Sequence, residues 1–161
     1  TINFLKKHRP QGAHILDLGT ENDLSHLMIK NGYNVESTQG QNLDIDFDVV
    51  KGAHIDTITA FEIFEHMFAP YNLLKNINSK HLIVSVPLKL WFANAYWSDN
   101  DEWDRHYHEF EIKQFNFLLE KTGWKIVAHE KWCSYQNFKF GIRPILRMFT
   151  PRYYLVYCQK I

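Results

Sequence analysis

The feature that most constrains the fold is a short apolar run that ends at a glycine and leads at once into a helical pattern. Residues 13–19, AHILDLG, form a compact apolar run of the kind found in buried strands. Residues 22–32 then carry apolar side chains at helical spacing. Asn22 or Asp23 would cap that helix and Gly32 would end it. A strand, a tight turn and a helix in immediate succession predict the first unit of an α/β sheet.

The same alternation continues along the chain. Helices are expected after Pro70 and over residues 110–123. Residues 81–87, HLIVSVP, are almost wholly apolar, which favours the centre of a sheet covered on both faces. No long helical pattern separates the last two strands, which indicates an antiparallel edge. Besides residues 13–19 and 81–87, the expected strands are residues 33–38, 47–50, 54–64, 124–132 and 152–160. We predict a three-layer, doubly wound α/β fold with a mostly parallel sheet of about seven strands.

Composition narrows the class of protein. The 161 residues contain neither repeat nor linker, so residues 1–161 are expected to form one domain. Eighteen basic and 18 acidic side chains balance, which argues against a partner such as bulk nucleic acid. Cys133 and Cys158 are the two cysteines, too few for a disulfide framework, so a cytoplasmic, reducing environment is expected. We read neither a signal peptide nor a transmembrane segment.

Four segments, in order, resemble the class I S-adenosylmethionine-dependent methyltransferases. They are ILDLG (15–19), DTITAFEIFEH (56–66), LIVSVP (82–87) and HYHEFEIKQFNFLLEKTGW (106–124). The first three match the family's first, fourth and fifth strands, and the last matches a histidine, Glu-Phe and amphipathic-helix segment found in many members. The resemblance implies a Rossmann-like methyltransferase fold, with S-adenosylmethionine as cofactor and S-adenosylhomocysteine as product.

The first of these segments departs from the family's usual Asp-x-Gly-x-Gly-x-Gly turn. Asp17 and Gly19 match, whereas Glu21 and Asp23 stand where later glycines would be. Glycines let the backbone approach the cofactor closely. Glu21 should therefore weaken cofactor binding unless its side chain turns to solvent or reaches the cofactor's ammonium group. Asp23 is more benign, because it can cap the helix.

The end of the second expected strand also departs from the family. Relatives usually carry a carboxylate there that accepts hydrogen bonds from the ribose, and this sequence aligns Gln39 with it. A neutral amide forms weaker bonds than a carboxylate. Asp44 or Asp46 could lie near the adenine amine, or could belong to a solvated loop. The cofactor-binding set implied by the resemblance is Asp17, Gly19, Thr20, Glu21, Gln39, Asp44, Phe61 and Glu62.

The chemistry candidates follow the fourth expected strand in the segment EIFEH. One helical turn there would bring Glu62, Glu65 and His66 together. His66 suits a general base, because imidazole titrates near neutrality and a neighbouring carboxylate can orient it. The segment also resembles the divalent-metal site of the small-RNA 2′-O-methyltransferases and ubiquinone-pathway O-methyltransferases, with His106 or His108 as a later ligand. A third reading is that His66 lines the cofactor pocket. The catalytic candidates are thus Glu65, His66, His106 and His108.

Two further segments remain open in role. Residues 89–108 are rich in aromatic side chains and could form a lid over the acceptor, or could pack on the chain's own core or on a second subunit. Residues 138–154 are basic and aromatic, and could contact an anionic acceptor, rest peripherally on a membrane, or form a solvated helix. Their cations are Lys139, Arg143, Arg147 and Arg152.

The sequence thus predicts an S-adenosylmethionine-dependent methyltransferase that acts on an oxygen or nitrogen of a small-molecule or glycan-linked acceptor. Methyl transfer requires mainly that donor and acceptor are held in line. The alternative is a degenerate domain that keeps the fold and serves as a binding or scaffolding module. A nicotinamide dinucleotide is a weaker alternative ligand, because the Gly-x-Gly-x-x-Gly turn is absent.

Overall fold

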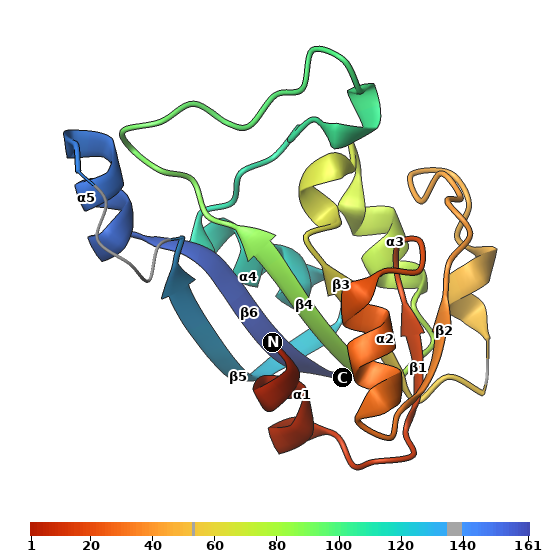
Figure 1. The fold of residues 1–161 in the computed structure, drawn as a ribbon. Coiled ribbons are helices and arrows are strands. Elements are labelled where there is room, and N and C mark those ends of the chain that lie inside the picture. The colour runs from red at the N-terminus through yellow and green to blue at the C-terminus, as the bar shows by residue number, and fades with distance from the viewer. Residues whose placement is uncertain (53, 135–139) are drawn as a thin grey trace.

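The computed structural model of the chain describes residues 1–52, 54–134 and 140–161. Strands and helices alternate along most of the chain (Figure 1). In order, the elements are α1 (Ile2–His8), β1 (His14–Asp17), α2 (Asp23–Lys30), β2 (Asn34–Ser37), η1 (Asp48–Lys51), β3 (Thr57–Phe61), η2 (Phe64–His66), α3 (Pro70–Asn76), β4 (His81–Pro87), η3 (Glu102–Asp104), α4 (Ile112–Lys121), β5 (Trp124–Cys133), α5 (Ile142–Phe149) and β6 (Pro151–Lys160).

One six-stranded sheet runs through the molecule in the order β2-β1-β3-β4-β6-β5. β1 pairs in parallel with β2 and β3, and β3 pairs in parallel with β4. β6 inserts antiparallel between β4 and β5. The mostly parallel sheet with an antiparallel edge is therefore confirmed. The apolar segment 81–87 lies near its centre, as expected for a strand covered on both faces.

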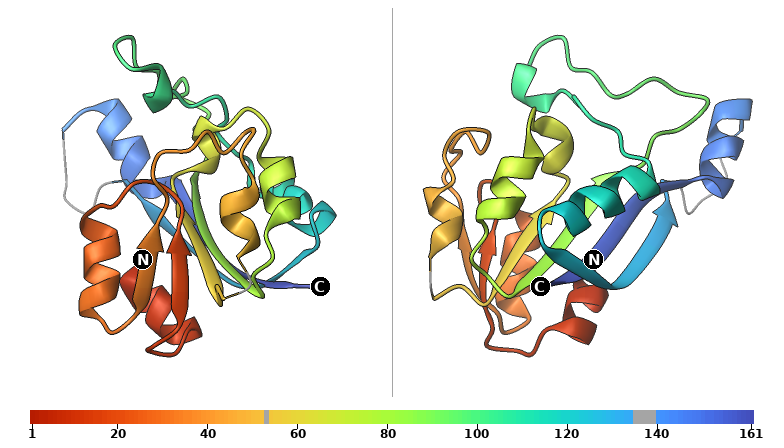
Figure 2. Two further views of the ribbon diagram at one scale, coloured as in Figure 1. Left: turned by 90° about the vertical axis from the view of Figure 1, so that its right-hand side faces the viewer. Right: turned by 180° about the vertical axis from the view of Figure 1, so that it is seen from behind.

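Helices cover both faces of this sheet, which confirms the three-layer architecture (Figure 2). Successive side chains of a strand point to opposite faces. In β4, Leu82 and Val84 accordingly join the core under α3 and α4, whereas Ile83 joins the core under α1 and α2. α5 stands apart from these layers at one end of the sheet. Its exposed apolar side chains are Ile142, Ile145 and Phe149.

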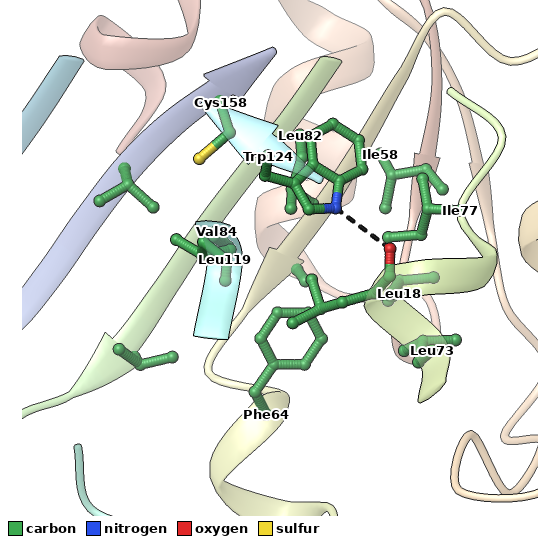
Figure 3. Close-up of a cluster of buried hydrophobic side chains, with 14 of the residues drawn as sticks. Leu18, Ile58, Phe64, Leu73, Ile77, Leu82, Val84, Leu119, Trp124 and Cys158 are labelled. Atoms are coloured by element: carbon green, nitrogen blue, oxygen red, sulfur yellow. Dashed lines mark hydrogen bonds between the residues drawn. The ribbon is translucent and has the colours of Figure 1, made fainter. Parts of the chain in front are cut away.

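The core beneath α3 and α4 is organised around Trp124, the first residue of β5 (Figure 3). Its ring is almost fully buried, and its indole N–H donates to the carbonyl of Leu74 at 3.1 Å. The buried polar atom is therefore satisfied, as an apolar environment requires. This bond ties β5 to α3 across the core and so fixes the antiparallel edge against the parallel part of the sheet.

Three details differ from the expectation. Residues 47–50 were expected as a strand, but Asp48–Lys51 form a 3₁₀ helix, which leaves six strands in the described sheet rather than about seven. The strand expected over 54–64 is restricted to Thr57–Phe61, because Glu62 adopts a positive φ of 55° that breaks the extended backbone. Helix α1 was not anticipated. Among the helices of the described residues, none is long and apolar enough to cross a bilayer.

Candidate functional site

The main candidate site is a cavity of about 420 Å³ at the carboxyl ends of β1, β2 and β3. The order of strands reverses at β1: the chain adds β2 on one side of β1 and then β3 on the other. Ligands of open α/β sheets bind at such a switch point, and the volume is in the range of small-molecule sites, roughly 300–1,000 Å³. The cavity is lined by Gly19, Thr20, Thr38, Gly40, Gln41, Asn42, Leu43, Asp44, Ile63, His66, Met67 and Trp103.

The turn after β1 is fixed by its backbone and by one hydroxyl. Gly19 adopts a φ of +114°, and a Cβ there would lie 3.2 Å from the side chain of Ile63, so a glycine is required. The Thr38 hydroxyl accepts from the Gly19 N–H at 2.8 Å and donates to the Gly19 carbonyl at 3.0 Å. Asp17 lies buried below the cavity, where burial raises the pKa of its carboxyl to about 6 despite a hydrogen bond from Thr59. Asp17 thus links the end of β1 to the neighbouring strand β3.

The residues that replace the family's later glycines point away from the cavity. Glu21 lies in solvent and pairs with His26 at 2.8 Å. Asn22, rather than Asp23, caps α2: its side chain accepts from the N–H groups of Leu24 and Ser25. The carboxylate of Glu21 therefore lies in solvent, one of the two positions in which it was not expected to weaken cofactor binding.

The loop after β2 places a different amide from the one expected. Gln39 is exposed, and its side-chain nitrogen donates to the Ser37 carbonyl, whereas Gln41 lines the cavity. Asp44 also lines the cavity, and its carboxylate accepts from the backbone N–H groups of Phe68 and Ala69 at 3.0 and 2.7 Å. Asp44 thus ties this loop to the start of α3.

The segment after β3 carries one half-buried and one fully buried carboxyl group. Glu62 receives a hydrogen bond from the Ser85 hydroxyl at 2.6 Å, and burial raises its pKa. Glu65 is fully buried, and neither of its carboxyl oxygens has a hydrogen-bond partner. Phe61, at the end of β3, packs against the core under α1 and α2 instead of lining the cavity.

His66 lies between the cavity and the aromatic loop. Its Nδ1 lies 3.1 Å from the Arg105 carbonyl, which can only accept, so this bond fixes the tautomer with the proton on Nδ1. Its Nε2, 3.9 Å from a Glu65 carboxyl oxygen, is then left as a base. Burial, and next the nearby His106, lower the pKa of His66, which keeps the imidazole neutral at pH 7. This is the protonation state that a general base requires.

A buried ion pair supports the other side of this cluster. Glu109 and Arg152 are 4% and 13% exposed, and their side chains are joined at 2.6 Å. Burial acts to raise the pKa of Glu109, but the contacts from His106 and Arg152 outweigh it and lower that pKa to about 2. Glu109 also accepts the Tyr96 N–H, and Arg152 donates to the Leu88 carbonyl. The pair thus fixes both ends of the aromatic loop.

The two histidines of the loop have different surroundings. The His106 ring lies 4.9 Å from the His66 ring, edge to face, whereas the His108 ring nitrogen lies 3.3 Å from the Phe68 carbonyl. The carbonyl of Glu65 accepts the N–H groups of Tyr107 and His108, so the loop is bonded directly to the EIFEH segment. His106 joins the candidate site and His108 does not.

Three of these side chains could hold a metal ion. Ligand atoms of Glu65, His66 and His106 all lie within 4.8 Å of one another. A mixed oxygen and nitrogen set suits zinc or manganese. Glu62, whose carboxylate is engaged by Ser85, and His108 are not members of this group. The cluster therefore fits a divalent ion as a three-residue set, smaller than the sequence suggested.

The buried Glu65 gives a testable pH dependence. Burial, and next the charge of Glu62, raise the pKa of Glu65 from 4.5 to about 9. Between these values the folded chain holds a proton that the unfolded chain has lost, so stability falls as pH rises, by up to about 1.4 kcal/mol per pH unit. We expect Glu65→Gln to reduce this slope and to be the more stable protein at pH 8. The measurement is the free energy of unfolding in urea at pH 5 to 8, for both proteins and with a chelator present.

Glu120→Gln provides the matched control, because it makes the same change at an exposed carboxylate of α4. Glu120→Gln should retain the wild-type slope. Parallel curves for the wild type and Glu65→Gln would contradict a protonated Glu65.

Several site residues were missed by sequence reasoning. They do not belong to motifs, and only the fold brings them to the cavity. The sequence held one local signal: Gln41 carries the same amide as Gln39, the expected ribose ligand, and lies two positions after it. The missed residues are Thr38, Gln41, Asn42, Trp103, Arg105, Glu109 and Arg152.

Comparison with known proteins decides the family. A family model described as a methyltransferase domain matches residues 1–129. The chain belongs to this methyltransferase family. The matched region contains β1 to β4, both histidines of the cluster and the aromatic loop. Among curated proteins, none matches this methyltransferase.

Solved structures share the methyltransferase fold at low sequence identity. Burkholderia thailandensis 1,6-didemethyltoxoflavin-N1-methyltransferase, solved with 1,6-didemethyltoxoflavin and S-adenosylhomocysteine, has a TM-score of 0.69 and 15% identity over 98% of this chain and 75% of its own. Magnesium protoporphyrin IX methyltransferase from Synechocystis PCC 6803, with bound S-adenosylhomocysteine, has a TM-score of 0.62 and 12% identity over 99% of this chain and 79% of its own. A methyltransferase in complex with the Haloferax volcanii Trm112 methyltransferase activator has a TM-score of 0.66 and 14% identity over 99% of this chain and 88% of its own.

Proposed function

We propose that this methyltransferase binds S-adenosylmethionine in the 420 Å³ cavity and transfers its methyl group to an oxygen or nitrogen of a small-molecule or glycan-linked acceptor. The observation that carries the proposal is His66, a neutral imidazole with its Nδ1 fixed by a carbonyl, on the wall of that cavity. S-adenosylmethionine supplies an activated methyl group. The chain has to hold the acceptor in line and remove its proton.

The residues at the cavity fit this cofactor. Gly19 presents backbone without a side chain, and Glu21, the residue that most threatened binding, points to solvent toward His26. The side-chain oxygens of Gln41 and Asn42 accept backbone N–H groups of their own loop at 2.6 and 3.1 Å, so their amide N–H groups are the ones offered to a ribose oxygen. Leu43 and Met67 offer apolar surface to a purine. Because the described lining offers an amide where relatives usually have a carboxylate, we expect weaker cofactor binding than at a site with an acidic residue.

His66 has the role of general base in this proposal. Its Nε2 accepts the acceptor's proton as the new bond to the methyl carbon forms, and Glu65 beside it is held neutral by burial. A neutral carboxyl does not stabilise the charged imidazolium, so His66 gives up its proton readily after each turnover. Trp103 of the aromatic loop forms part of the cavity wall beside this step.

The test is calorimetric titration with S-adenosylmethionine and S-adenosylhomocysteine, with a nicotinamide dinucleotide as a negative control. Binding of the first two in the micromolar range is expected. We further expect Gln41→Ala to raise the Kd for S-adenosylhomocysteine by about two- to tenfold, the effect of losing one hydrogen bond. Gln39→Ala is the matched control, because Gln39 lies outside the cavity lining, and it should leave the Kd unchanged.

The outcomes separate the competing functions. An absence of binding up to millimolar concentration would favour the degenerate, non-enzymatic domain. Equal losses in Gln39→Ala and Gln41→Ala would mean that the ribose contacts a different part of the loop. Dinucleotide binding in place of S-adenosylmethionine binding would overturn the proposal altogether.

A further inference from the structure

A second cavity, of about 540 Å³, lies beside His106. Its lining residues come from the aromatic loop, the residue that follows β5, α5 and the start of β6. His66 lines the first cavity and His106 lines the second, and their rings are in edge contact at 4.9 Å. The second cavity is lined by Leu90, Asn94, Ala95, Tyr96, Trp97, His106, Ser134, Arg147, Arg152 and Tyr153.

The cations of this cavity are not equivalent. Arg152 is neutralised by Glu109 at 2.6 Å, and its other guanidinium nitrogen donates to the Leu88 carbonyl. Arg147, from the last turn of α5, also lines the cavity. The described lining residues include no carboxylate. The described side of the cavity therefore carries a net positive charge, with Arg147 as its source.

The remaining walls are aromatic and polar. Tyr96, Trp97 and Tyr153 contribute ring surface, and Asn94 and Ser134 contribute hydrogen-bonding groups. The position of Tyr96 is fixed, because its carbonyl accepts the N–H of His106 and its own N–H donates to Glu109. Rings of this kind bind the flat face of an aromatic or sugar ring, and a guanidinium binds a carboxylate or phosphate with directed hydrogen bonds.

We propose that this cavity is the acceptor subsite and that Arg147 selects an acceptor bearing a carboxylate or phosphate group. The inference rests on the proposed methyltransferase function. The anionic group lies at Arg147, the ring lies between the aromatic side chains, and the nucleophilic oxygen or nitrogen lies at the histidine pair. As this atom bonds to the methyl carbon, the methyl group leaves the sulfur of S-adenosylmethionine, S-adenosylhomocysteine is released, and the proton of the attacking atom passes to His66.

The test uses three probes that differ only in the group presented to Arg147: 4-hydroxybenzoate, 4-hydroxyphenyl phosphate and the neutral 4-hydroxybenzamide. Each is titrated calorimetrically into the whole chain with saturating S-adenosylhomocysteine. At least one acid should bind about tenfold more tightly than the amide, the effect of one charge-assisted hydrogen bond. The tighter acid identifies the preferred anionic group. Arg147→Gln should abolish the preference and leave the Kd for S-adenosylhomocysteine unchanged.

Arg143→Gln is the matched control, because Arg143 is exposed on the same helix and does not line the cavity. It should retain the preference for the acid. The proposal is overturned if acids and amide bind equally, if neither acid binds to protein that binds S-adenosylhomocysteine, or if both arginine variants behave alike. Loss of S-adenosylhomocysteine binding in the wild type, with the acid preference retained, would instead refute the cofactor proposal and leave the anionic subsite in place.

Discussion

Replacement of His66 by alanine is expected to lower kcat by about 10²- to 10⁴-fold, the usual contribution of a general base. The Kd for S-adenosylhomocysteine should change by less than about threefold, since His66 is one of many residues that line the cavity. The physical reason is that the Arg105 carbonyl holds the proton on Nδ1, which leaves Nε2 as the basic nitrogen of the ring. The measurement is S-adenosylhomocysteine formation on the acceptor found by screening.

His54→Ala is a suitable control, because His54 is exposed and pairs with Glu36 away from both cavities. It should retain wild-type turnover. In the wild type, burial and next His106 lower the pKa of His66. In a plot of kcat against pH, the midpoint of the rise should therefore lie below 6.5, the ordinary histidine value. A large loss of S-adenosylhomocysteine affinity in His66→Ala, with kcat little changed, would make His66 a pocket-lining residue instead of a base.

Replacement of Arg152 by methionine is expected to destabilise the fold by about 3–5 kcal/mol, because it leaves the carboxylate of Glu109 buried without its cation. The pair holds the pKa of Glu109 at about 2, so its contribution is complete above pH 4.5 and is lost as pH falls toward 2. Urea denaturation at pH 7 measures the loss through the midpoint and slope of the transition.

The double variant Glu109→Gln with Arg152→Met should recover much of this loss, because it removes the uncompensated charge as well as the cation. Arg143→Met, which alters an exposed arginine, should change the free energy of unfolding by less than about 0.5 kcal/mol. A double variant no more stable than Arg152→Met alone would show that Arg152 acts through its bond to the Leu88 carbonyl rather than through Glu109.

The outline of the fold could be predicted from local patterns. The run 81–87 is apolar at every position but its first and its serine, and it forms the strand β4 covered on both faces. Pro70 begins α3 as expected, because its fixed φ suits the first helical turn. The error over residues 47–50 came from the same reasoning. Four residues with two valines suit a strand or one turn of helix equally well, and packing decides between them.

The site was predicted in part. EIFEH identified the segment, because a chemistry-bearing pair after an apolar strand lies at the carboxyl edge of the sheet in any parallel α/β fold. The choice between His106 and His108 was beyond the sequence. Adjacent loop positions point in directions set by backbone bonds, here those of Tyr107 and His108 to the Glu65 carbonyl. The same holds for Gln41, which replaces Gln39 at the cavity by the course of a loop.

The sequence by itself determined the order of strands and helices, the methyltransferase resemblance and the place of the EIFEH segment, because these depend on short-range periodicity and on spacing along the chain. Only the tertiary structure decided which charges are free. Arg147 and Arg152 look alike in the sequence, but Glu109, 43 residues from Arg152, neutralises one and leaves the other to line the second cavity. Charge pairing over such distances depends on the folded arrangement of the sheet and its loops, and local sequence does not encode it.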